Sequence, residues 1–543
     1  SHSKYFKLRK EGENMNDDDY DEDWEETYLK THEETTRAFT EKLPQVVRLY
    51  QKSACEVAHL NEVPAAVSFF SLLGQISKDF VAIPNGRNIE DTRIHFCQIQ
   101  TSGSGKSTLY NFTGPIAKKV FAEINDLKKH PYNERKPMIQ EQREDEEGNE
   151  WIHSEGVRKT FDTFSVQIAS SAALIGEWKA IQEMEEDDNG NERPTGIWKD
   201  EFFEGALEGS GFLHYDEFEY SGVFSPSQHQ TDTIVILNTL CNTLHGESWI
   251  NRKRLLGGKD IVCYSERSIV AMTYPPKELN DIMTEKGLLQ RMVCFIWDVP
   301  PAVLDKIRRE VISTAGTIQD VNAPIDNFVK SFIKIYKCLE ERYQEVLSEG
   351  GTSINTMVYT DEFRETLMLE YESMMSFVNG SGLFVREVAD SFVGRILKNI
   401  IRMAVLCSIA EAPSITDKSK RFIVRGKHVR QAGSINRQCY KTLIDWLERS
   451  LRNQRKAVSE KVDFKAIVAI YRKMEVDYKR KNPQEKDAII NKTVFRQKIQ
   501  EDLKKSQASV YRIWARIESK FIETKTGRTT NVKLIEDQKE VKK

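Results

Sequence analysis

A chain of 543 residues is too long for one hydrophobic core, so roughly two to four domains are expected. Charged residues make up 30% of the chain and apolar residues 39%, which is typical of a soluble protein. The sequence has no run of about 20 apolar residues, so we expect neither a membrane span nor a membrane partner. The eight cysteines occur singly, without a C-x-x-C pair. This spacing argues against a zinc site or a disulfide framework and predicts a reducing, cytoplasmic location.

The net charge of -4 conceals an uneven distribution along the chain. Residues 17–26 are strongly acidic, so residues 1–43 are predicted to form a flexible tail that also suits mimicry of DNA or docking of a partner. From Leu451 onward, roughly 25 Lys and Arg stand against 13 Asp and Glu. This second segment is therefore expected to contact phosphates.

The predicted elements begin with a helical segment, residues 44–90, whose helices lie within 44–80. A short strand over 94–99 leads through a Gly/Ser loop into a helix over 109–127. Residues 130–158 and 183–191 are polar and are predicted to be surface loops.

Strands and helices alternate again further along the chain, which predicts an α/β core over 91–300. We expect strands over 211–218, 268–272 and 292–297, a helix over 229–245 and a hairpin over 248–264. A helical region, 301–445, and a basic domain, 446–543, follow. The basic domain ends in an amphipathic helix (506–517) and a hairpin (521–535), the order typical of a winged helix.

Residues 101–108 carry the strongest chemical signal, because glycines here join a predicted strand to a predicted helix. Glycines allow successive backbone N–H groups to face phosphate oxygens, and the helix N-terminus adds a favourable partial charge. The pattern predicts a P-loop that binds ATP through Gly103, Ser104, Gly105, Lys106, Ser107 and Thr108. Lys106 is expected to reach the β- and γ-phosphates and Ser107 to ligate Mg²⁺. Gln100 replaces the first glycine of the usual pattern, and a Ser/Gly loop that binds no nucleotide is the alternative.

Hydrolysis of ATP requires a second acid on the metal and a base that orients water. Asp216 and Glu217 follow an apolar run at the end of a predicted strand. Asp216 is therefore predicted to face Mg²⁺ and Glu217 to face the attacking water. The alternative is a solvated acidic turn, since Glu219 lies nearby.

The order of these motifs resembles the AAA+ core of the minichromosome maintenance (MCM) helicases and related P-loop proteins of phages and plasmids. That family's pattern reads G-D-P-G-x-A-K-S, I-D-E-F, a basic hairpin, a sensor strand ending in A-N-P, and L-L-S-R-F. This chain has QTSGSGKS at 100–107, YDEF at 215–218, SIVAMTYP at 268–275 and LLQRM at 288–292. The resemblance covers residues 90–445 and implies an AAA+ fold with a helical lid. The family's zinc-bearing N-terminal domain and OB-fold have no counterpart in residues 1–90.

The resemblance also assigns roles to individual residues. Arg291 matches the arginine that reaches the γ-phosphate of a neighbouring subunit, and an ordinary surface ion pair is the alternative. Arg395 begins a helix, RILKNIIR at 395–402, that is similar to the family's lid helix, so it is a candidate sensor-2 residue or else a helix arginine without that role. The sensor-1 asparagine aligns with Tyr274, which leaves Thr273 as the candidate nucleotide contact.

Two basic surfaces are expected to bind DNA. The first is the tip of the hairpin over 248–264, which in the similar helicases grips the DNA backbone, and its cations are Arg252, Lys253, Arg254 and Lys259. The second is the winged-helix-like domain, with Arg512, Arg516, Lys520, Lys525 and Arg528. Solvated surface charge is the alternative for the hairpin, and a protein-interaction module is the alternative for the domain.

Together these features predict an ATP-dependent DNA helicase or translocase that works as a homo-hexameric ring in the replication of a mobile genetic element. Replication partners are expected to dock on the winged helix or the acidic tail. Two other functions stay open. One is a P-loop ATPase that packages DNA or remodels proteins, and the other is a winged-helix DNA-binding regulator that ATP switches without hydrolysis.

Overall fold

The computed structural model divides the chain into two compact units, Ser1–Glu448 and Arg449–Lys543. The residues that it describes are 42–58, 62–127, 140–144, 150–154, 161–166, 174–186, 192–203, 205–218, 231–242, 245, 253–254, 260–261, 263, 265–275, 287–297, 299, 301–315, 322–380, 383–414, 421–485, 488–503, 510, 514, 521–526 and 529–534. The acidic stretch 17–26 lies outside them. No helix within these ranges is both long and apolar enough to cross a membrane.

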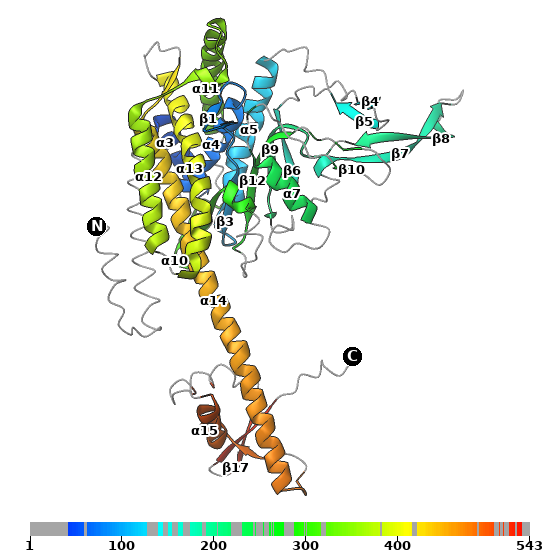
Figure 1. Ribbon diagram of the computed structural model, residues 1–543, viewed down its shortest axis with the longest axis vertical. Coiled ribbons are helices and arrows are strands. Elements are labelled where there is room, and N and C mark those ends of the chain that lie inside the picture. Colours follow the sequence, from blue (N-terminus) through cyan, green and yellow to red (C-terminus); the bar gives the residue numbers. More distant parts are fainter. Residues whose placement is uncertain are drawn as a thin grey trace. The chain divides into compact units, whose positions relative to one another are not determined.

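A five-stranded parallel sheet occupies the centre of the first unit, in the strand order β13-β3-β12-β9-β6 (Figure 1). Its members are β3 (Phe96–Gln100), β6 (Phe161–Val166), β9 (Gly209–Tyr215), β12 (Ser265–Thr273) and β13 (Val293–Trp297). Every residue of β3, β9, β12 and β13 is buried. Such burial is typical of parallel strands covered on both faces, so the predicted mixed α/β class is confirmed.

Helices cover this sheet and make up most of the rest of the first unit. Helix α4 packs against β3, β12 and β13, α5 packs against β6, and α7 packs against β12. An aromatic cluster of Tyr50, Phe69, Phe112, Phe328 and Phe332 joins four helices. Helices α12 and α13 lie side by side (Figure 1). The helices are α3 (Gln45–Ala58), α4 (Glu62–Ser77), α5 (Lys106–Leu127), α7 (Thr231–Leu240), α9 (Leu288–Arg291), α10 (Pro301–Thr314), α11 (Asn322–Ser348), α12 (Asp361–Gly380), α13 (Leu383–Glu411) and α14 (Gly426–Lys481).

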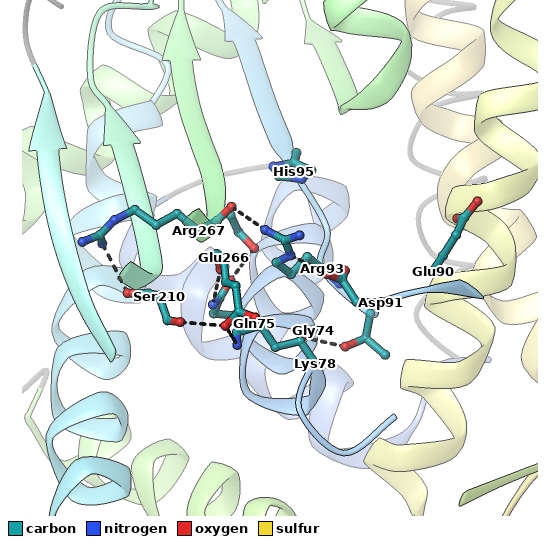
Figure 2. A network of polar contacts seen from close by, with 12 residues as sticks. Gly74, Gln75, Lys78, Glu90, Asp91, Arg93, His95, Ser210, Glu266 and Arg267 are labelled. Carbon is teal, nitrogen blue, oxygen red and sulfur yellow. Dashed lines mark hydrogen bonds and ion pairs between the residues drawn. The ribbon is translucent and has the colours of Figure 1, made fainter. Parts of the chain in front are cut away.

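Buried polar contacts fix the amino-terminal ends of the strands (Figure 2). Glu266 of β12 forms an ion pair with Lys78, which follows α4, and accepts from the Ser210 hydroxyl of β9 over 3.1 Å. The Gln75 amide donates to the carbonyl oxygen of Glu266 over 2.8 Å. Arg267 donates to the carbonyl oxygen of Glu208 over 2.8 Å. Because these contacts align β9 and β12 at one end, their opposite, carboxyl ends also finish at neighbouring positions.

Paired strands occur in the two polar segments, 130–158 and 183–191, that are predicted to be surface loops. The predicted loop over 183–191 is wrong at its first four residues, because β7 (Glu177–Glu186) pairs antiparallel with β8 (Glu192–Phe203). This hairpin is largely exposed, so its sequence lacks the apolar alternation of a half-buried strand. Within 130–158, β4 (Gln140–Glu144) pairs with β5 (Glu150–Ser154). The other short elements are β1 (Ile83–Asn85), β2 (Asn88–Glu90), β10 (Lys253–Arg254), β11 (Asp260–Ile261), η4 (Ser353–Thr356), β14 (Met357–Tyr359), η5 (Ala412–Ser414) and β15 (Phe422–Val424).

The second unit has its own hydrophobic core and a three-stranded sheet in the order β16-β18-β17. Its elements, besides the end of α14, are β16 (Ile490–Asn491), α15 (Lys492–Asp502), β17 (Phe521–Thr526) and β18 (Thr529–Leu534). Tyr471, Phe495, Trp514 and Phe521 form the centre of the core. The predicted hairpin over 521–535 is confirmed. Most of the predicted helix over 506–517 lies outside the described residues.

Candidate nucleotide site

The glycine loop, residues 101–105, joins the end of β3 to the start of α5. Gly103 has a φ of 74° and Gly105 a φ of 86°, a left-handed conformation that residues with a Cβ rarely adopt. The amide of Leu109 donates to the carbonyl oxygen of Gly105 over 3.2 Å, so helical hydrogen bonding already includes the loop. The first N–H groups of α5 have no partner inside the helix, which suits this end of the helix to an anion.

Lys106 lies buried at the carboxyl edge of the sheet. Its ammonium group donates to the carbonyl oxygens of Gln100 and Thr273, over 2.8 and 2.9 Å. It also lies 3.6 Å from the centre of the Tyr274 ring, within cation–π distance. Lys106 thus connects the ends of β3 and β12. Thr273, a predicted nucleotide contact, meets Lys106 through its backbone carbonyl.

Asp216 and Glu217 come directly after β9, and both are exposed, whereas the next residue, Phe218, is buried. The hydroxyl of Ser107 donates to Oδ1 of Asp216 over 3.4 Å, so the two predicted metal ligands lie together. Hydroxyl and carboxylate oxygens are ligands that Mg²⁺ prefers, and Mg²⁺ takes its remaining ligands from phosphate and water. These two residues therefore fit a magnesium–nucleotide complex.

Gln100 stands where the usual pattern has a glycine, and its side chain is buried. The Gln100 side-chain oxygen accepts from the amide of Gln98 over 2.7 Å and from the Ser104 hydroxyl over 3.5 Å. On the other side of the loop, the amide of Val299 donates to the Thr101 hydroxyl over 3.1 Å. The glycine loop is thus tied to β3 and to the residues after β13.

A stacked pair of rings connects α5 to β9 beside these groups. The rings of Tyr110 and His214 are parallel within 3°, with their centres 3.3 Å apart. Burial lowers the pKa of His214 to about 4, so its imidazole is neutral near pH 7. Tyr110 lies one helical turn after Lys106, and His214 lies two residues before Asp216. The stacked pair can therefore hold the start of α5 against the end of β9.

A second group of predicted residues meets in a pocket of about 290 Å³. Arg291, at the end of α9, and Arg395, on α13, both line it. The guanidinium of Arg291 donates to the carbonyl oxygen of Gly287 over 2.8 Å and to the side-chain oxygens of Asn242 and Asn238 over 3.1 and 3.4 Å. Burial and the nearby Arg395 lower the pKa of Arg291. Of the described residues that line the pocket, none comes from the glycine loop.

The backbone of the predicted basic hairpin is confirmed where the structure describes it. Lys253 and Arg254 form β10, and they lie opposite Ile261 and Asp260 of β11. Arg252 and Lys259 lie outside the described residues. In the second unit, Lys525 of β17 lies opposite Thr530 of β18. The remaining predicted DNA contacts are outside the described residues: Arg512, Arg516, Lys520 and Arg528.

Sequence reasoning missed several groups around both sites. The resemblance identifies Tyr274 only as the counterpart of the sensor-1 asparagine, although its ring covers Lys106. Asn238 of α7 and Asn242, two residues after α7 ends, hold Arg291, and Glu90 lines the same pocket. The spacing of the two asparagines, four residues apart on a predicted helix, was the available signal, since residues at that spacing share one face.

No protein-family model matches the chain, and no curated protein resembles it significantly.

The buried imidazole predicts a specific dependence of stability on pH. Unfolded His214 gains its proton near pH 6.5 and folded His214 only near pH 4, so the unfolded state binds more protons between these values. The contribution of His214 to the free energy of unfolding should therefore fall by about 3 kcal/mol as the pH drops through that window. His214→Phe, which keeps an aromatic ring on Tyr110, should remove this contribution. Urea unfolding of both proteins at several pH values measures the difference, and parallel pH profiles would contradict the assignment.

Proposed function

We propose that this protein is an ATP-hydrolysing motor that acts on DNA, with an AAA+-type P-loop core and a C-terminal winged-helix domain. The convergence of Lys106, Ser107 and Asp216 at the carboxyl ends of β3 and β9 carries the proposal. In open α/β sheets, ligands bind at this edge, where the direction of the strand connections reverses. The chain leaves β3 toward β6 but leaves β12 toward β13, on the opposite side of β3, so the reversal lies at the glycine loop.

Each residue of the site has a role in this proposal. ATP with Mg²⁺ supplies the phosphoryl group that is transferred. The amides of the glycine loop and the ammonium of Lys106 bind its phosphates, while Ser107 and Asp216 hold the metal. Glu217 is exposed next to Asp216 and orients the attacking water.

The pocket around Arg291 and Arg395 supports a site completed by a second copy of the chain. A partly buried arginine beside another cation is unfavourable until an anion approaches. In this proposal the anion is the γ-phosphate held by the neighbouring protomer, and protomers assemble into a hexameric ring. This arrangement agrees with the resemblance to the MCM helicases.

Contact with DNA is proposed for two regions. The β10–β11 hairpin carries cations at and beside its strands, a composition that favours phosphate contact without reading of bases. The second unit combines a compact core with the excess of Lys and Arg that begins near Leu451. A role in DNA replication is proposed from the resemblance to the MCM helicases.

Substitutions in the glycine loop and after β9 should separate nucleotide binding from hydrolysis. Lys106→Ala removes the cation that faces the phosphates and should abolish turnover. Glu217→Gln keeps the loop and the metal ligands, so it should bind ATP and fail to hydrolyse it. Release of phosphate and binding of a fluorescent ATP analogue measure the two properties. Normal turnover in Glu217→Gln would reassign the water-orienting residue.

The hairpin should couple hydrolysis to DNA. Replacement of Arg252, Lys253 and Arg254 with alanine should leave basal ATPase activity unchanged and remove both its stimulation by DNA and strand separation. A control replaces two exposed cations elsewhere, Arg308 and Arg309 on α10, which should change neither property. If DNA still stimulates the hairpin variant and strands still separate, the hairpin is only a solvated loop. DNA stimulation without strand separation in the wild type would favour a packaging motor.

Mixed assemblies test whether Arg291 acts on a neighbour. Arg291→Ala should bind ATP normally and lose turnover by on the order of 10³-fold. Mixing it with Lys106→Ala protomers should restore part of the activity, because some interfaces then combine an intact loop with an intact arginine. Native mass spectrometry confirms that mixed assemblies have formed. Full activity of Arg291→Ala alone is incompatible with a role across the interface.

A further inference from the structure

The pocket that contains Arg291 and Arg395 has an unusual balance of charge. Lys398 and Arg402 line it as well. Among the described residues that line the pocket, Glu90 alone carries a carboxylate. Four cations therefore share a cavity of about 290 Å³ with one carboxylate. Such crowding is unfavourable unless the carboxylate is placed to neutralise particular cations.

Glu90, the last residue of β2, neutralises two of the four. Its Oε1 pairs with the Lys398 ammonium over 2.5 Å, and its Oε2 pairs with the Arg402 guanidinium over 2.6 Å. Burial favours the neutral acid, but Arg402 and Lys398 outweigh burial and lower the pKa of Glu90, which is therefore ionised at neutral pH. Figure 2 shows its side chain pointing away from the Lys78–Glu266 pair and toward the helices of the later chain.

The other two cations lie in a different environment. Neutral oxygens of Gly287, Asn238 and Asn242 hold Arg291, and no described carboxylate forms an ion pair with it. Among the described residues, Arg395 has no ion pair with a carboxylate, and it lies close enough to Arg291 to lower that group's pKa. Arg291 and Arg395 are therefore the pair that an incoming anion meets.

The spacing along α13 connects the two halves of the pocket. Arg395, Lys398 and Arg402 lie three and four residues apart, so they project from one face of the helix. Glu90 is itself held in place, because it lies opposite Ile83 in the β1–β2 ladder and Asn85 donates to its carboxylate over 3.2 Å. Glu90 thus links two successive turns of α13 to β2, a contact that depends on the rotation of the helix about its axis.

We propose that Glu90 is a positioning residue. By holding Lys398 and Arg402, it sets the rotation of α13 that presents Arg395 beside Arg291 to a phosphate on the neighbouring protomer. This inference rests on the proposed function of the pocket, and it adds an acidic residue that acts through α13 without touching the nucleotide.

Glu90→Gln tests the proposal, because it keeps the shape of the side chain and removes its charge. Turnover at saturating ATP should fall by roughly 10²-fold, the effect expected of a misplaced transition-state group, while binding of a fluorescent ATP analogue to the same protomer stays unchanged. Mixed with Lys106→Ala, the variant should regain activity, since its own glycine loop is intact. Mixed with Arg291→Ala, it should regain none, because both changes damage the same side of the interface.

Two further variants separate positioning from a general loss of stability. Glu90→Asp keeps the charge but shortens the side chain by one methylene, so it should show a smaller loss of turnover with the same complementation pattern. Glu370→Gln breaks a comparable buried pair, with Arg437, outside the pocket. It should lower the melting temperature and leave turnover unchanged at temperatures where the protein is folded.

The outcomes distinguish this inference from the function on which it rests. Wild-type turnover in folded Glu90→Gln and Glu90→Asp, with turnover still lost in Arg291→Ala, overturns the role of Glu90 alone. Recovery of activity between Glu90→Gln and Arg291→Ala also overturns it. Absence of ATP hydrolysis in the wild-type protein overturns the proposed function itself.

Discussion

A buried ammonium group at the edge of the sheet is the constraint around which the candidate site is built. Two carbonyl oxygens, from Gln100 and Thr273, lie within hydrogen-bonding distance of Lys106 and help to stabilise its charge in the interior, together with the ring of Tyr274. These carbonyls converge because β3 and β12 are adjacent and in register, with Thr273 opposite Ile99. The same adjacency brings β9 to the other side of β12, so that Asp216 reaches Ser107.

The first unit separates two kinds of positive charge. Lys106 lies at the carboxyl ends of the parallel strands, and Arg291 and Arg395 lie in a pocket formed with α13. Glycine-loop amides and the Lys106 ammonium suit phosphates bound by the same chain, whereas the arginines face a cavity that the loop does not line. Neutral amide oxygens position Arg291 without cancelling its charge, which preserves its attraction for an anion. The separation of Lys106 from the two arginines supports the proposed site shared between protomers.

Local patterns predicted much of the central sheet and picked out the residues that meet at the candidate site. Glycines, apolar runs and turn residues located β3, the glycine loop, β9 and β12 to within a few residues, because each depends on its own segment. Non-local features escaped prediction. Stacking of His214 on Tyr110 requires α5 to lie against β9, and the pairing of Glu90 with α13 joins residues more than 300 positions apart. The exposed β7–β8 hairpin escaped for another reason, since solvent on both faces leaves no apolar period to detect.

The strand order has a consequence for the synthesis of the chain. Both neighbours of β3, β12 and β13, follow it by well over a hundred residues, and Lys106 and its partner Thr273 are separated by 167 positions. A ribosome adds about 5–20 residues per second, so β3 emerges on the order of 10 s before either neighbour exists. Throughout that interval the backbone edges of β3 are unpaired and exposed to other nascent chains. Efficient production of this protein should therefore depend on chaperones that shield β3 while the rest of the sheet is made.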